Sequence, residues 1–127
     1  MMQSLIVGLG GFVGSILRYQ LSGLILHHSK EWRFPLNTFT INILGCLTMG
    51  VLAGLAERHG MFSPETRLFL ITGLLGGFTT FSAFSFEGVD LLRRGEPAIA
   101  LLYAALSVII GFGVVWLAIR LVTSGNH

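Results

Sequence analysis

The chain has 127 residues, of which 53% are hydrophobic and 11% charged, with 17 glycines and a mean hydropathy of +0.78. Soluble domains carry charge at roughly a quarter of their positions, so this composition excludes an ordinary soluble domain and indicates a membrane protein. The single cysteine, Cys46, offers neither an internal disulfide nor a thiolate metal cluster, and the formal charge of +2 comes from scattered basic residues, which is not the pattern of a nucleic-acid-binding face.

Four apolar stretches are each long enough for a spanning helix, which needs about 20 residues. They cover residues 5–26, 36–56, 68–92 and 98–122, and short connections with charged residues, glycine or proline separate them. The sequence therefore predicts an all-α integral membrane protein with four transmembrane helices, folded as a single domain over residues 1–127.

The first and second stretches carry glycine pairs at helical spacing, Gly10 with Gly14 and Gly50 with Gly54. Small residues four apart allow the backbones of two membrane helices to approach closely. These pairs predict helix contacts, which can lie within one subunit or between two subunits.

The same two stretches each hold a polar residue at membrane depth. Arg18 lies well inside the first, although a long arginine can extend toward the interface. Asn42 lies about a third of the way into the second and needs partners in protein or water. Asn42 therefore predicts either an interhelical hydrogen bond or a functional amide donor.

The third stretch contains the run Gly-Gly-Phe-Thr-Thr-Phe-Ser-Ala-Phe-Ser at residues 76–85. Irregular backbone at membrane depth persists only where it is buried in protein or lines a wet cavity. We therefore expect the third helix to break over Gly76–Thr80, near mid-membrane, and to form part of a functional site. Glu87 and Asp90 follow near Arg93 and are interpreted as an interfacial charge cluster.

The chemistry of the central groups favours an anion. Hydroxyls surround Phe81 and Phe84, which lie on one helix face and whose ring edges are electropositive. Tyr103 and Ser107 place two more hydroxyls on one face of the fourth stretch. A proton-coupled exporter of small molecules or cations, the main alternative, would need a central carboxylate, which the first, second and fourth stretches lack.

Two further classes can be weighed. The histidines, His27, His28, His59 and His127, are expected in connections or the tail, and no nucleophile and base have convincing spacing, so an enzyme is not expected. A membrane protein that only makes interactions would not need the run at residues 76–85.

The distribution of charge predicts dual topology. Cations are nearly balanced between the two membrane sides, with Arg58, Arg67 and Arg120 on one and Lys30, Arg33, Arg93 and Arg94 on the other. Orientation is normally fixed by an excess of Lys and Arg on the cytoplasmic side. The chain is therefore expected to insert both ways and to form an antiparallel homodimer with a two-fold axis in the membrane plane.

Along essentially its whole length the chain resembles the Fluc (CrcB) family of bacterial fluoride channels. The matching features are the four-span size, the near-neutral charge bias and three motifs: Gly10-Gly11 through Arg18-Tyr19, Asn37 to Gly45 with Asn42, and the run at residues 76–85. One departure is Ala83, where many relatives carry threonine.

The resemblance implies a passive, fluoride-selective channel of the bacterial inner membrane that exports fluoride and protects against its toxicity. It implies an antiparallel homodimer in the lipid bilayer with two fluoride pores, no nucleic-acid partner, and a structural sodium ion held at the dimer interface by the backbone carbonyls of Gly76 and Thr79. The implied pore residues are Phe81, Phe84, Asn42, Ser82, Ser85, Tyr103 and Ser107, with Arg18 near the aqueous entrance.

Overall fold

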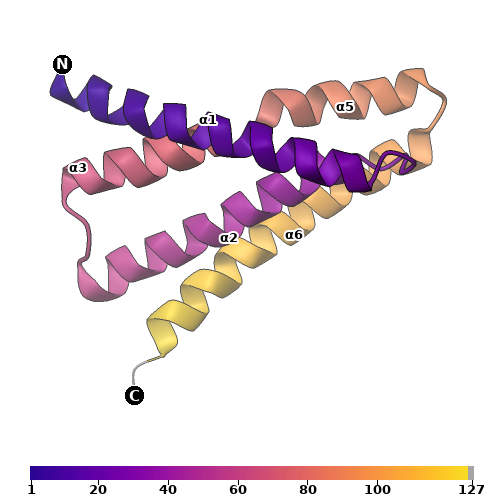
Figure 1. Ribbon diagram of the computed structural model, residues 1–127. Coiled ribbons are helices and arrows are strands. Elements are labelled where there is room, and N and C mark those ends of the chain that lie inside the picture. Colours follow the sequence, from indigo (N-terminus) through magenta and orange to yellow (C-terminus); the bar gives the residue numbers. More distant parts are fainter. Residues whose placement is uncertain (126–127) are drawn as a thin grey trace.

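The computed structural model describes residues 1–125, and every regular element in that range is helical (Figure 1). Three long helices are continuous: α1 (Met2–His28), α2 (Leu36–His59) and α6 (Pro97–Ser124). The third span, Pro64–Arg93, is divided into α3 (Pro64–Arg67), the π-helix η1 (Leu68–Leu75), α4 (Gly76–Phe78) and α5 (Phe81–Arg93).

All four spans are long and apolar enough to cross a membrane, which confirms the predicted four-helix membrane protein. The helices extend slightly beyond the predicted stretches, so His27, His28 and His59 occupy last turns rather than connections. Gly60 follows the last residue of α2, and its φ of 58° is a left-handed conformation that favours glycine at a helix C-terminus.

The helices pack as two pairs, with α1 along η1 and α4, and α2 along α6 (Figure 1). Glycines line both seams. A Cβ on Gly10 would lie 2.5 Å from the Phe69 carbonyl oxygen, and one on Gly50 would lie 2.7 Å from the Cβ of Ala118. The predicted glycine pairs therefore serve contacts within one subunit, because any side chain there would force the paired helices apart.

The third helix does break, but not at its glycines. Gly76 keeps helical angles, φ −60° and ψ −36°, whereas Thr79 and Thr80 are extended, with φ −87°, ψ 158° and φ −150°, ψ 119°. The expectation that the glycine pair forms part of the break was wrong. Gly77 is needed for packing instead, since its Cβ would lie 2.6 Å from the Gly11 carbonyl oxygen.

Beyond the break, α5 packs against α6 through a small core of Leu91, Ala100 and Tyr103. Much of the remaining apolar surface is uncovered in a single subunit, including Phe12 at 65%, Phe81 at 78% and Phe112 at 76% exposure. This exposed apolar surface is suited to contact with lipid or with a second protein, because either of them can shield apolar side chains from water.

Candidate functional site

The Thr79–Thr80 break is held by Asn42, which reaches it from α2. The Asn42 Nδ2 donates to the Thr80 carbonyl oxygen at 3.0 Å, and the Thr80 N–H donates to Asn42 Oδ1 at 2.9 Å. In a continuous helix that N–H would donate to the Gly76 carbonyl. Asn42 thus pairs with both backbone groups of Thr80 and replaces the helical hydrogen bond that the break removes.

Side chains also stabilise the two flanks of the break. On one flank, the Arg18 Nε donates to the Gly77 carbonyl oxygen at 3.0 Å. On the other, Thr80 Oγ1 accepts from the Ala83 N–H at 3.2 Å and so caps the N-terminus of α5. In an unbroken helix the Ala83 N–H would donate to the Thr79 carbonyl. The carbonyls of Gly76 and Thr79 therefore both lose their helical donors to side chains.

An apolar pocket of about 490 Å³ lies between α2, the third span and α6. The rings of Phe81 and Phe84 line it, with centroids 5.7 Å apart and planes tilted by 47°. Ser107 lines it from α6, and the Ser107 Oγ is buried without a hydrogen-bond partner in the described part of the chain. Asn42, Gly76, Thr79 and Thr80 also contribute to this wall.

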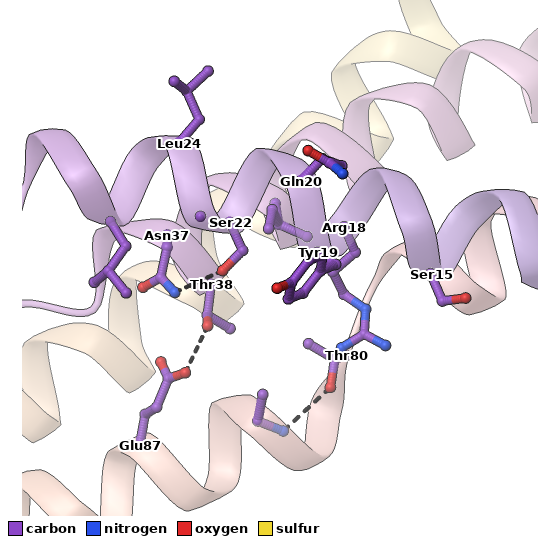
Figure 2. Close-up of a pocket in the computed structure, with 14 residues that line it drawn as sticks. Ser15, Arg18, Tyr19, Gln20, Ser22, Leu24, Asn37, Thr38, Thr80 and Glu87 are labelled. Carbon is purple, nitrogen blue, oxygen red and sulfur yellow. Dashed lines mark hydrogen bonds between the residues drawn. The ribbon is translucent and has the colours of Figure 1, made fainter.

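A second, more polar pocket of about 740 Å³ lies between α1, α2 and α5 (Figure 2). Thr80 lines both pockets, so both of them border the break. Figure 2 shows Arg18 reaching from α1 toward the break segment, while Asn37 donates to Ser22 at 2.9 Å. The remaining polar members of this lining are Ser15, Tyr19, Gln20, Thr38 and Glu87.

The interpretation of Glu87 as part of an interfacial charge cluster was wrong. Asp90 pairs with Arg94 at 2.8 Å, but Glu87 turns inward and accepts from the Thr38 hydroxyl at 2.6 Å and the Tyr103 hydroxyl at 3.2 Å. Sequence reasoning therefore missed Thr38 and misplaced Glu87. The available signal was spacing, because Glu87 follows Phe84 by one helical turn and so shares its face of α5.

The structure brings together some of the predicted pore residues and separates others. Asn42, Phe81, Phe84 and Ser107 meet in the apolar pocket, together with Gly76 and Thr79. Arg18 lines the polar pocket.

The other three predicted pore residues lie outside both linings. Tyr103 is fully buried against Phe84 and Phe34, with ring centroids 5.0 and 5.3 Å away. Ser82 and Ser85 are exposed on α5, with the Ser82 hydroxyl 3.3 Å from that of Thr80. The expectation for His127 concerns a position outside the described residues.

Comparison with known proteins identifies the family. Residues 5–119 match the model of the CrcB-like protein, Camphor Resistance (CrcB), family. A protein of Methylobacillus flagellatus named fluoride-specific ion channel FluC is 53% identical over 96% of this chain and 95% of its own length. Proteins with the same name from Flavobacterium psychrophilum and Nitratidesulfovibrio vulgaris are 46% and 39% identical, over 87% and 94% of this chain and 88% and 95% of their own lengths. The chain belongs to the CrcB-like family.

Proposed function

We propose that this protein is a passive fluoride channel that drains fluoride from the cytoplasm across the bacterial inner membrane. The relatives named fluoride-specific ion channel FluC support the choice of ion. The observation that carries the proposal within the structure is the apolar pocket, which two phenylalanine rings line together with Ser107, whose buried hydroxyl has no hydrogen-bond partner among residues 1–125.

Such a pocket can solvate a small anion without a fixed positive charge. The electropositive ring edges of Phe81 and Phe84 attract an anion, and the Ser107 hydroxyl can donate to it. The Asn42 amide has a second N–H beyond the one bonded to Thr80 and is available as a further donor. A finite set of donors around a narrow path is one means by which a pore selects an ion.

The direction of flow follows from the membrane potential and the acid chemistry of fluoride. Hydrogen fluoride crosses lipid when neutral and ionises in a near-neutral cytoplasm, so an acidic medium loads the cell with fluoride. A negative-inside potential drives an anion outward by about 2.3 kcal/mol per 100 mV. A passive pore is therefore sufficient for export, and no catalytic step or proton exchange is required.

The rival reading, a proton-coupled exporter of small molecules or cations, gains no support from the site. Glu87 is a carboxylate within the third span, but it accepts from two protein hydroxyls and does not line the apolar pocket. A cation carrier would need a carboxylate that is free to exchange its proton for the cargo.

The functional unit in this proposal is an antiparallel homodimer with two pores. Phe81 is 78% exposed, and Ser82 and Ser85 are also exposed, so these residues can line a closed pathway only when a partner covers them. The near balance of cations between the two ends supports insertion in both orientations. Tyr103 then contributes by holding the Phe84 ring, and Arg18 lies toward an aqueous entrance.

A structural sodium ion fits the break of this chain. The carbonyls of Gly76 and Thr79 have lost their helical donors to Asn42 and Thr80, and carbonyl oxygens are ligands that suit a hard cation. Two copies of the break, related by the two-fold axis, would supply four such oxygens. Bound there, the ion would neutralise the converging carbonyl dipoles and join the two subunits.

Voltage-clamped efflux from liposomes tests the proposed function. Purified protein is reconstituted in vesicles loaded with fluoride, a potassium ionophore sets the voltage, and a fluoride electrode follows release. Rapid efflux that requires the ionophore, with little efflux from matched chloride-loaded vesicles, is the expected result. Well-folded protein that releases no fluoride would disprove the proposal, and efflux without the ionophore would point to coupled exchange instead.

A further inference from the structure

The contact between Arg18 and the break has a specific geometry. The hydrogen bond to the Gly77 carbonyl comes from Nε, at 3.0 Å, rather than from the terminal nitrogens of the guanidinium. Nε is the inner nitrogen, close to the aliphatic stem. Figure 2 shows the stem extending from α1 toward the break segment, so the side chain is directed at the backbone and not only at the open pocket.

The packing of α1 sets the register of this contact. Gly10, Gly14 and Arg18 follow one another at intervals of four residues and so share a face of α1. A Cβ on Gly10 would lie 2.8 Å from the Leu74 N, and one on Gly14 would lie 3.0 Å from the Phe78 N. The glycine contacts thus advance along the third span by one turn, from Leu74 to Phe78. One turn further along α1, Arg18 contacts the backbone of the third span at Gly77, next to the break.

The contact also falls where the backbone has lost a partner. In a continuous helix the Gly77 carbonyl would accept from the Phe81 N–H, but the extended Thr79 and Thr80 carry Phe81 away. A carbonyl left unpaired at membrane depth is costly. Arg18 replaces that donor, as Asn42 Oδ1 replaces the acceptor of the Thr80 N–H.

We propose that Arg18 is a positioning residue whose Nε–H holds the Gly77 carbonyl and fixes the shape of the break. In this role the hydrogen-bond donor at the Nε position matters more than the positive charge. Together with Asn42, Arg18 makes the break a preformed feature of each subunit, before any ion or partner binds. The two residues reach the break from different helices, Arg18 from α1 and Asn42 from α2.

Three substitutions separate the donor from the charge. In Arg18→Gln the amide nitrogen lies the same number of bonds from the backbone as Nε, so a donor is kept while the charge is lost. In Arg18→Lys the charge is kept, but a methylene occupies the Nε position. In Arg18→Met neither remains, although the length of the stem is similar. Gln20→Met is the matched control, because Gln20 lines the same pocket but is exposed.

Hydrogen–deuterium exchange of the full-length protein in vesicles tests the proposal without any ion flux. The readout is the segment 76–84, whose Thr80 and Ala83 amides are protected only while the break keeps its shape. Arg18→Lys and Arg18→Met are expected to exchange about tenfold faster there, the effect of losing one charged hydrogen bond. Arg18→Gln is expected to stay within about threefold of the parent chain, and Gln20→Met to match it.

Exchange across α6 monitors global folding. If Arg18→Met fails to fold, the comparison is made between the Arg18→Gln and Arg18→Lys variants alone. Slow exchange in Arg18→Lys with fast exchange in Arg18→Gln would overturn the proposal, because the charge would then be the active feature. Equal exchange in all variants, or fast exchange in both Gln and Lys, would overturn it as well.

A flux measurement extends the test and rests on the proposed function. At about 1 M salt, where a surface charge is screened over roughly 3 Å, fluoride efflux is expected to rank Arg18→Gln above Arg18→Lys and Arg18→Met. The reverse order would assign Arg18 to charge attraction at the entrance. If the parent chain itself conducts no fluoride, the proposed function fails while the exchange result still decides the role of Arg18.

Discussion

At the scale of single residues, the Phe81 ring is the most direct test of how the pocket handles an anion. Phe81→Ile keeps a large apolar side chain but removes the electropositive ring edge. We expect fluoride efflux to fall by at least about tenfold, which corresponds to roughly 1.4 kcal/mol in the barrier. The matched control is Phe86→Ile on the same helix, because Phe86 is 69% exposed and lies outside the pocket lining. Equal efflux in the two variants would contradict an aromatic contribution.

Ser107 offers a second residue-scale prediction, in which flux and stability separate. Its hydroxyl is buried without a partner in the part of the chain that the structure describes, so Ser107→Ala breaks no hydrogen bond seen there and removes a desolvated polar group. We expect stability in detergent to be unchanged or higher by up to about 1 kcal/mol. If the hydroxyl donates to the permeating anion, fluoride efflux should fall several-fold.

The comparison variant for Ser107→Ala is Thr48→Val on α2. Its hydroxyl donates to the Leu44 carbonyl at 2.9 Å and lies outside both pockets. Thermal melting and efflux are measured on both variants. A Ser107→Ala protein that is less stable, yet conducts normally, would show that the hydroxyl has a structural partner and no role in the pore.

At the scale of helices, the glycine seam between α1 and η1 positions the break, since it holds the first half of the third span against α1. In Gly14→Ala the new methyl group would collide with the Leu74 carbonyl. Overpacking of this kind typically costs 1–3 kcal/mol, so we expect a lower melting temperature. Gly8→Ala on the same helix is the control, because no atom of the described residues lies within 4 Å of its Cβ position and alanine favours a helix. A seam that tolerates both substitutions equally would show that the backbones separate easily.

The same seam explains how much of the third span could be predicted from the sequence. The four spans and the existence of a break followed from composition and from the run at residues 76–85. Its exact place did not, because glycine permits both a break and a close helix contact. The choice between them depends on Gly11, far away in the sequence, against which Gly77 packs.

The site was predicted unevenly for a similar reason. Phe81, Phe84, Asn42 and Ser107 were expected at the site and do share a pocket. However, the pairing of Asn42 with the backbone of Thr80, and the inward turn of Glu87 onto Thr38 and Tyr103, depend on side chains from different helices. Periodicity within one helix predicts which face a residue occupies, but not which partner it meets across the bundle.

At the scale of the whole molecule, a single subunit leaves much of its apolar surface and its polar break uncovered. Most of the large apolar side chains that are exposed lie on α1, α5 and α6, and the polar break lies among them. Lipid can cover the apolar residues but offers no hydrogen bonds to the freed carbonyls of the break. A second copy can cover the apolar residues, and a cation held between the two breaks can satisfy the carbonyls, which is why the proposed dimer and the proposed cation site depend on the same surface.

Insertion in both orientations is the property on which an antiparallel dimer depends, and it can be changed with charge alone. The end that carries residues 29–35 and 93–96 has four Lys and Arg residues, and the opposite end has three. One variant, His28→Lys with Glu31→Lys, raises the count at the first end to six. The other variant combines His59→Lys, Met61→Lys and Arg93→Gln, which leaves three Lys and Arg residues at the first end and five at the opposite end. All five positions are exposed, so the fold should tolerate the changes.

Each charge-biased variant is expected to insert in one orientation and, expressed alone, to give little fluoride resistance in cells that lack another fluoride exporter. Co-expression should restore resistance, because the two variants supply opposite orientations of one fold. Cysteine accessibility at an exposed tail position measures the orientation of each variant directly. A control pair of variants biased toward the same end should not restore resistance. Full resistance from a single variant that is shown to have one orientation would rule out the antiparallel dimer and would require a parallel assembly or a pore formed by one subunit.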